Sequence, residues 1–309
     1  MTEKVIEVNS LVKKYGNLTT VDNISFSIKK GEIFAFLGPN GAGKTTTVEI
    51  LECLRTATSG SVNVLGYNTK KDDFKIKQRI GVLPQDFSAF EWLNVYENID
   101  YFAKMYPKHL NVNEIIETLD LEDKRNTLFK DLSGGLKQRV GVAISLVNDP
   151  EMVFLDEPTT GLDPKARRDV WDAVKELKNK GKTVFLTTHY MDEAYYLADR
   201  VCVLHKGQII AEGTPDDLIN RYGGGNTLII RGCDPEARNE LINAIPDGTV
   251  EGNDVLAKLS EDDAVASISV AASIINTGDF TCEEIYVRKS TLEDVFLNLT
   301  GEKLTKGGK

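Results

Sequence analysis

The fold is decided by one stretch, GPNGAGKTT, which occupies residues 38–46. It matches the pattern G-x-x-x-x-G-K-[ST], in which glycines let successive backbone N–H groups converge on an anion beside a positive helix N-terminus. The preceding residues, 33–37, are all apolar, as in a strand buried on both faces of a parallel sheet. The following residues place Val48, Leu51 and Leu54 at helical spacing. A strand, a glycine turn and a helix in this order predict a phosphate-binding loop.

Within this loop the residue types suit a nucleoside triphosphate. Lys44 is expected to reach the β- and γ-phosphates, and the Thr45 hydroxyl to hold Mg²⁺. A chance match to so short a pattern is the alternative, and the flanking strand and helix argue against it. By itself the loop indicates only that a nucleoside triphosphate binds.

Composition describes an ordinary globular chain. With 309 residues, 41% hydrophobic and 27% charged, it is long enough for two domains. The net charge of −10 argues against nucleic acid as a partner, because such surfaces need clustered Lys and Arg. The first residues lack a signal peptide's apolar core, and no apolar run approaches the ~18 residues that span a bilayer. We therefore expect a cytoplasmic protein that reaches a membrane only through a partner.

Four cysteines are spread along the chain: Cys53, Cys202, Cys233 and Cys282. There is no C-x-x-C pair, so the sequence indicates neither a zinc site nor an iron–sulfur site. We expect all four to be small apolar core residues in a reducing compartment.

Hydrophobic periodicity predicts the elements of residues 1–220. Alternating residues predict an N-terminal antiparallel β subdomain with strands at 5–8, 24–28 and 60–64. Apolar runs alternating with helical patterns predict a mostly parallel α/β core with strands at 33–37, 80–85, 152–155, 183–187 and 201–204. Consecutive helical patterns at about 86–148, including a helix capped by Ser133, predict an inserted helical subdomain, because a crossover needs only one helix. Together these elements predict a P-loop NTPase domain.

Residues 221–309 differ in pattern and predict a second, accessory α+β domain. Residues 221–225, which end in three glycines, are interpreted as a linker. The elements that follow have the order β-α-β-β-α-β, the ferredoxin-like arrangement, at 227–231, 235–244, 249–250, 255–259, 262–275 and 284–287.

The end of the chain carries one more helical pattern. Ser290 and Glu293 fit a capping box for a last helix at 291–299. The basic tail at 301–309 is expected to be disordered.

Two adjacent carboxylates follow the strand at 152–155. In P-loop enzymes such a strand is expected beside the loop strand, where its first acid holds Mg²⁺, so Asp156 is the candidate. Glu157 can then orient and deprotonate the water that attacks the γ-phosphate. Two surface acids at a strand end are the alternative interpretation.

Several further short motifs carry little information alone: Gln85 and His189 after strands, LSGGLKQ at 132–138 and GLD at 161–163. In this order, with the phosphate loop and the two carboxylates, they resemble the ATP-binding subunit of ABC transporters over residues 1 to about 220.

The resemblance implies a role for each matching position. Tyr15 would stack on the adenine ring. The residues of the loop would bind the phosphates: Asn40, Gly41, Gly43, Lys44, Thr45 and Thr46. Gln85 would bridge Mg²⁺, the attacking water and the transporter partner. Glu157 would be the general base, and His189 would contact the γ-phosphate.

The resemblance also implies a homodimer in the ATP-bound state. Ser133 and Gly135 would contact the γ-phosphate of ATP bound to the opposite subunit. Asp163 would contact the opposite subunit across the same dimer interface. This sequence departs from the family at one place, since Leu136 stands where the family's commonest form has Gln. ATP and Mg²⁺ are the implied cofactors. An integral membrane permease is the implied partner, which would hold the chain at the cytoplasmic face of the cell membrane.

The C-terminal region, 226–301, resembles that of drug-exporter-type (ABC-2 type) subunits, which implies export of drugs, lipids or other small molecules through a separate membrane subunit. A soluble ABC ATPase acting on a macromolecule is the alternative, although no long coiled-coil insertion or basic patch is visible. A P-loop GTPase would need N-K-x-D, and NKGK at 179–182 lacks the final Asp.

Residues 85–105 are rich in aromatic side chains: Phe87, Phe90, Trp92, Tyr96, Tyr101 and Phe102. We expect most of them to form the core of the helical subdomain, with one or two facing a membrane partner.

Overall fold

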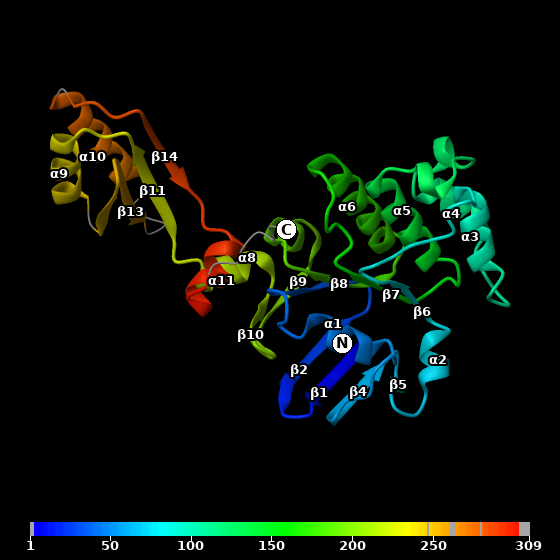
Figure 1. Ribbon diagram of the computed structural model, residues 1–309. Helices are drawn as coiled ribbons and strands as arrows, with labels where there is room; N and C mark the ends of the chain where they lie inside the picture. Colours follow the sequence, from blue (N-terminus) through cyan, green and yellow to red (C-terminus); the bar gives the residue numbers. More distant parts are fainter. Residues whose placement is uncertain (1–2, 246, 260–263, 279, 303–309) are drawn as a thin grey trace. The chain divides into compact units, whose positions relative to one another are not determined.

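The computed structural model describes residues 3–302 except 246, 260–263 and 279 (Figure 1). Its contacts divide the chain into two compact units, Met1–Pro215 and Asp216–Lys309, a few residues before the boundary expected at 220. The start of the helix expected at 262 and nearly all of the tail expected at 301–309 lie outside the described residues.

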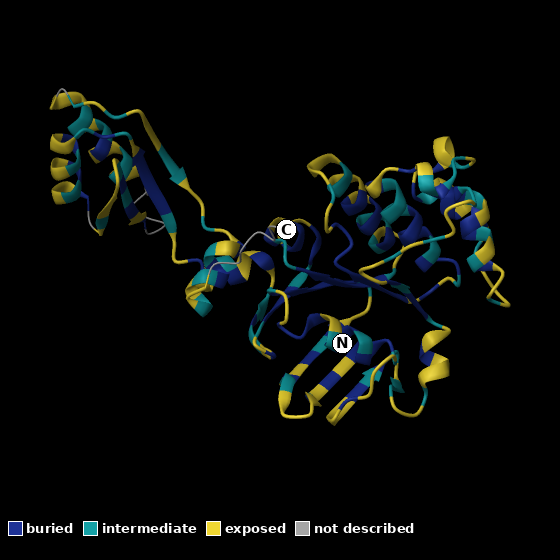
Figure 2. Cartoon of the chain, viewed as in Figure 1, coloured by how far each residue is buried: buried dark blue, intermediate teal, exposed yellow. Residues whose placement is uncertain are grey.

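The first unit is built around a six-stranded sheet of order β10-β9-β3-β8-β7-β6. Its strands are Ile33–Leu37 (β3), Ile80–Leu83 (β6), Met152–Asp156 (β7), Thr183–Thr188 (β8), Arg200–His205 (β9) and Gln208–Gly213 (β10). β6, β7, β8, β3 and β9 are parallel, and β10 runs antiparallel to β9. Every residue of β3, β7 and β8 is buried (Figure 2), which explains their continuous apolar runs.

A second, antiparallel sheet of order β2-β1-β4-β5 packs against the first. Its strands are Lys4–Tyr15 (β1), Leu18–Lys29 (β2), Ser59–Val64 (β4) and Tyr67–Asn68 (β5). A shared aromatic core joins the two sheets: the ring of Phe26 lies 5.7 Å from Phe34 and 4.9 Å from Phe36 of β3. The predicted antiparallel subdomain is therefore present, and its strands are longer than expected.

The helices of the first unit are α1 (Lys44–Leu51), α2 (Asp73–Lys77), α3 (Val95–Ala103), α4 (Val112–Thr118), α5 (Gly134–Ser145), α6 (Pro164–Asn179) and α7 (Met191–Leu197), with 3-10 turns at Glu122–Lys124 and Phe129–Asp131. Helices α3, α4 and α5 form the predicted insertion between β6 and β7 (Figure 1). Its helix starts are capped by side chains, since Asn94 forms a capping box with Glu97 and Ser133 accepts the Leu136 N–H. The predicted P-loop NTPase architecture is confirmed.

The second unit contains an antiparallel sheet of order β12-β13-β11-β14. Its elements are α8 (Pro215–Tyr222), β11 (Asn226–Arg231), α9 (Pro235–Ala244), β12 (Gly248–Glu251), β13 (Asp254–Leu259), α10 (Ala264–Thr277), β14 (Glu284–Arg288) and α11 (Leu292–Thr300). Leu228, Ile230 and Val255 pack with Leu241 of α9 and Ala271 of α10 in one core. The order β-α-β-β-α-β and the pairing of the first strand with the third and fourth agree with the predicted ferredoxin-like arrangement.

Two local predictions in this region are wrong. Arg221 and Tyr222 end helix α8 instead of forming a linker. The capping box lies one residue later than expected, because the Asp294 carboxylate accepts hydrogen bonds from the N–H and hydroxyl of Thr291. The Ser290 hydroxyl is not free to cap α11, since it donates to Gly223 O at 3.1 Å.

The aromatic-rich segment also differs from expectation. Trp92 is 72% exposed, Phe90 and Tyr101 are each 45% exposed, and the other three rings are only partly buried. Val95, Ile99 and other aliphatic side chains form the core instead. Three of these six rings, those of Phe90, Trp92 and Tyr101, are thus available to a partner.

Candidate functional site

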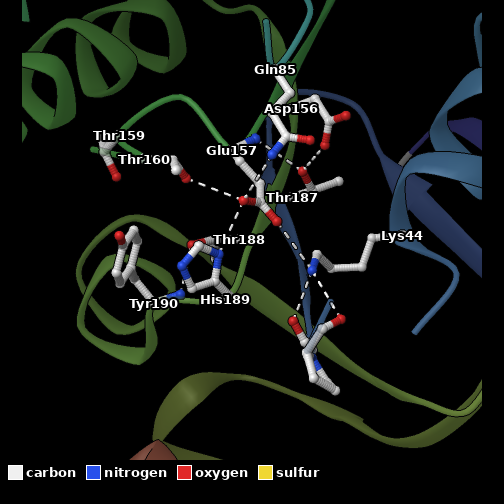
Figure 3. Close-up of polar contacts among 12 residues, drawn as sticks. Lys44, Gln85, Asp156, Glu157, Thr159, Thr160, Thr187, Thr188, His189 and Tyr190 are labelled. Carbon is white, nitrogen blue, oxygen red and sulfur yellow. Dashed lines mark hydrogen bonds and ion pairs between the residues drawn. The ribbon is translucent and has the colours of Figure 1, made fainter. Parts of the chain in front are cut away.

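Parallel strands bring together four segments that are far apart in sequence. In the sheet register Asp156 lies beside Thr187, so β7 and β8 end at the same edge. The phosphate loop follows β3, Gln85 follows β6, Glu157 follows β7 and His189 follows β8, and their side chains meet there (Figure 3). One detail of the prediction is wrong: β7 does not lie beside β3, because β8 separates them.

The loop backbone has the conformation that its glycines allow. Gly41 and Gly43 have φ values of 80° and 102°, in the left-handed region. At Gly43 a Cβ atom would also lie 2.7 Å from the Thr20 carbonyl oxygen. Helix α1 begins at Lys44, and the N–H groups of its first turn have no acceptor within the helix, so they can bind an anion.

Lys44 is held by the loop and by a carboxylate. Its ammonium donates to Gly38 O at 2.8 Å and Pro39 O at 3.2 Å, and it lies 3.2 Å from Glu157 Oε1. The side chain is 4% exposed, and burial lowers the pKa of Lys44 although the Glu157 charge opposes this. The ammonium therefore lies within the loop where a phosphate would bind, and Glu157 is its counter-ion.

Glu157 is the centre of the polar cluster in Figure 3. Its Oε2 lies 3.0 Å from His189 Nδ1 and 3.5 Å from Gln85 Nε2, and accepts the Thr160 hydroxyl at 3.1 Å. Burial acts to raise the pKa of Glu157, but His189 and Lys44 outweigh it and lower the pKa to about 2. The residue adopts a left-handed backbone, φ 49°, a conformation that concentrates at functional sites.

Asp156 is a second buried carboxyl group, 7% exposed. Burial raises the pKa of Asp156, although hydrogen bonds from the Thr187 and Thr45 hydroxyls act to lower it. Thr187 also accepts the Glu157 N–H at 3.0 Å, so it orients both acids. The carboxylate and the Thr45 hydroxyl are hard oxygen donors at the foot of the phosphate loop, and this donor set fits Mg²⁺.

Tyr15, the expected adenine platform, ends strand β1 and is 40% exposed. The Lys13 ammonium lies 4.8 Å from the centre of its ring, and the Arg55 guanidinium 5.7 Å. An exposed aromatic face beside two cations suits an aromatic base attached to phosphates.

The other predicted ATP-contacting residues lie apart from this cluster. Ser133 and Asp163 are exposed and cap α5 and α6, and Asp163 accepts the N–H groups of Lys165 and Ala166 at 3.0 Å. Gly135 is buried where a Cβ would lie 2.6 Å from Ala166 Cβ, so close packing of α5 on α6 requires glycine. Among the described residues, no hydrogen bond or ion pair links these three to the Lys44–Glu157 cluster.

One buried carboxyl group near the site was not predicted. Glu193 of α7 is fully buried, and its Oε1 accepts the Thr159 hydroxyl at 2.7 Å and the Trp171 indole N–H at 2.9 Å. Burial raises the pKa of Glu193. It ties the segment after Glu157 to α6 and α7, and nothing in the sequence distinguishes it from a surface acid of a helix.

The fold and the site define a P-loop nucleoside triphosphatase: a glycine loop at a helix N-terminus faces a lysine, two acids and a histidine at the carboxyl edge of a parallel sheet. Within the described residues, none of the helices is both long enough and apolar enough to cross a bilayer.

Comparisons with known proteins narrow this class. The family model described as "ABC transporter" matches residues 21–160. The chain is 34% identical to the daunorubicin resistance ATP-binding protein DrrA3 of Streptomyces coeruleorubidus, over 98% of each chain. It is 36% identical to the Nod factor export ATP-binding protein I of Paraburkholderia xenovorans (strain LB400), over 98% of this chain and 99% of that protein. The dimeric ATP-binding cassette MJ0796 bound to ADP and Pi is 29% identical, with a TM-score of 0.60, over 68% of this chain and 98% of that one.

The chain therefore belongs to the ABC transporter family, as an ATP-binding subunit that hydrolyses ATP. This agrees with the transporter interpretation of the sequence and not with the soluble alternative.

Proposed function

We propose that two copies of this chain bind and hydrolyse ATP in shared sites and so power export of a small molecule through a separate integral membrane subunit. Export is supported by the names of the relatives, which refer to daunorubicin resistance and Nod factor export. A shared site is supported by the dimeric state of the related cassette. The chain would then lie at the cytoplasmic face of the membrane, held there by the membrane subunit.

The observation that carries the shared site is the separation of two sets of residues. The phosphate loop and Glu157 form one cluster, whereas Ser133 and Asp163 are exposed at helix starts elsewhere on the same unit. A helix N-terminus with an exposed hydroxyl attracts phosphate oxygens. In a head-to-tail pair each ATP would be bound by the loop of one copy and by Ser133 and the Gly135 backbone of the other, with Asp163 at the seam. ATP then stabilises the closed pair because it contacts both copies only in that state.

Within each site, different residues of this chain would bind the phosphates, the Mg²⁺ ion and the adenine ring. The loop backbone and three side chains would bind the phosphates: Asn40, Gly41, Gly43, Lys44, Thr45 and Thr46. Thr45, Asp156 and Gln85 would hold Mg²⁺, whose charge stabilises the negative charge on the phosphates. Tyr15 would stack on the adenine ring.

Glu157 would act as the general base. When the γ-phosphate enters the loop, it competes with Glu157 for the Lys44 ammonium, which now lies 3.2 Å from the carboxylate. Losing that counter-ion raises the proton affinity of Glu157 from its low resting value, so it can accept a proton from the attacking water. His189, 3.0 Å from Glu157, would hold the carboxylate in place and contact the γ-phosphate.

A groove on the first unit supports docking of a membrane subunit. It has a volume of about 550 Å³ and is lined mainly by apolar side chains, among them Leu54, Phe87, Tyr106 and Ile144. Pro84 and Asp86 also line it, and Gln85 between them lies 3.5 Å from Glu157. Movement of a cytoplasmic segment of the membrane subunit in this groove would thus be transmitted to the catalytic carboxylate through Gln85.

Complementation between two inactive variants tests the shared site. Ser133→Arg places a bulky cation at the half-site, and Lys44→Ala removes the phosphate ligand, so each variant alone should lack ATPase activity. In a mixed pair, the loop of the Ser133→Arg chain faces an intact Ser133, which restores one site. Random pairing then predicts recovery of about a quarter of wild-type activity on mixing equal amounts. If the mixture is as inactive as each variant alone, although both variants are folded and form mixed dimers, the shared-site proposal is wrong.

A further inference from the structure

Two cysteines of the second unit lie side by side although 49 positions separate them. Cys233 Sγ lies 2.6 Å from Cys282 Sγ, in the connections before α9 and before β14. Cys233 is 3% exposed and Cys282 is partly exposed. Cys233 and Cys202 are core residues, as expected, whereas Cys282 and Cys53 are only partly buried. Among the described residues, the sulfur atoms of Cys53 and Cys202 do not contact another cysteine.

The surrounding backbone holds the two thiols together on both sides. On one side Asp234 N–H donates to Thr281 O at 3.1 Å, and Thr281 N–H donates to the Asp234 carboxylate at 2.8 Å. On the other side Glu283 N–H donates to Arg231 O at 2.8 Å. These bonds bracket the cysteine pair. The main obstacle to closing a long loop is the entropy lost when the chain is ordered. Here the chain is already ordered around both sulfurs, so forming the bond requires no further loss of this kind.

We propose that Cys233 and Cys282 form a reversible redox site, which a low-molecular-weight disulfide such as oxidised glutathione converts into an intramolecular disulfide. The thiolate of Cys282, the more exposed sulfur, attacks one sulfur of the reagent and releases one thiolate. The Cys233 thiol then loses its proton and attacks the Cys282 sulfur, which releases the second. The released thiolates take up two protons, so the protein dithiol loses two electrons and the reagent gains them.

Burial of Cys233, with its neighbouring groups, slows the ring-closing step of this reaction. Burial, the adjacent Cys282 and the carboxylates of Asp234 and Asp254 raise the pKa of Cys233 to about 12. Since the thiolate is the nucleophile, ring closure is slow at neutral pH and should accelerate by roughly tenfold between pH 7 and pH 8. The bond would tie the connection before α9 to the connection before β14, and so restrain the second unit in oxidising conditions.

Mass spectrometry of the full-length protein tests the site. The folded chain is treated with oxidised glutathione, remaining thiols are alkylated, and the protein is digested with trypsin without reduction. The expected product is peptide 232–238 linked to peptide 259–288, about 2 Da lighter than the sum of the two free peptides. Cys53 and Cys202, in peptides 45–55 and 201–206, serve as internal controls and should be recovered alkylated.

Two variants complete the test. In Cys233→Ser the mixed disulfide between Cys282 and glutathione should persist, since no second thiol is present to displace glutathione. In Cys282→Ser the linked peptide should be absent, and peptide 232–238 should be recovered with Cys233 alkylated. Both variants should keep wild-type ATPase activity, which shows that the first unit is folded, and the wild-type circular dichroism spectrum, which shows that the second unit is folded as well. The proposal is overturned if wild-type protein yields no linked peptide, or if linkage to Cys53 or Cys202 is as frequent as linkage between Cys233 and Cys282.

Discussion

Replacing Glu157 by Gln separates the two tasks that the structure gives this carboxylate. It is the counter-ion of Lys44 and lies 3.0 Å from the His189 ring. During hydrolysis it would be the base. We expect Glu157→Gln to destabilise the folded first unit and to remove turnover, while ATP binding remains.

The structural cost follows from the acidity of the group. The pKa of Glu157 falls from its ordinary 4.5 to about 2 in the folded protein. Each pKa unit corresponds to ~1.4 kcal/mol, so the carboxylate contributes about 3 kcal/mol of stability at neutral pH. Because the folded pKa is the lower one, this contribution is complete above pH 4.5 and is lost as the pH falls through 2. The difference between wild type and Glu157→Gln should therefore be largest at pH 7 and shrink on acidification.

Urea unfolding followed by tryptophan fluorescence measures this difference. Both tryptophans, Trp92 and Trp171, lie in the first unit with Glu157, so their signal reports the unfolding of that unit. The matched control is Glu117→Gln, which removes an exposed carboxylate of α4. Equal midpoints for Glu157→Gln and wild type at pH 7, or a difference that grows towards pH 3, would refute the assigned ion pair.

Turnover of the same variants tests the catalytic task. Loss of a general base should lower kcat by roughly a thousandfold. ATP affinity should hold or rise, because the neutral amide neither competes for Lys44 nor repels the phosphates. On a sizing column Glu157→Gln should then run as a dimer with ATP. Hydrolysis at the rate of Glu117→Gln would remove Glu157 from the role of base.

Two further predictions concern the pairing of chains and the loop backbone. Wild-type turnover per chain should fall on dilution, because each site needs two copies, and a rate per chain that stays constant down to high dilution would contradict this. Gly43→Ala should lower the free energy of unfolding by about 3 kcal/mol against about 1 kcal/mol for Gly41→Ala. Both glycines have positive φ, but only at Gly43 would a Cβ meet backbone, the Thr20 carbonyl at 2.7 Å. Equal midpoints in urea for the two variants would show that the close approach is unimportant.

Local features of this chain follow from the sequence because their causes are local. Strand β3, the glycine turn and helix α1 are encoded by an apolar run, residues with free φ and helical spacing over about 20 residues. The cap at Ser133 and the start of α6 are likewise set by neighbouring residues, since Asp163 caps that helix and Pro164 occupies its first position. The candidate site residues could likewise be identified from the sequence, because each belongs to a short motif of neighbouring residues.

Tertiary structure decided what these residues contact. Spacing along the chain does not reveal that β8 lies between β3 and β7, or that Lys44, Glu157 and His189 share one cluster, because strand order is set by packing across the whole sheet. It does not distinguish the buried Glu193 from a surface acid. Nor does it bring Cys233 beside Cys282, since only the folded β-α-β-β-α-β unit closes the 49 positions between them. Long-range contacts of this kind depend on how all the elements of the folded chain pack against one another, and no short stretch of sequence contains that information.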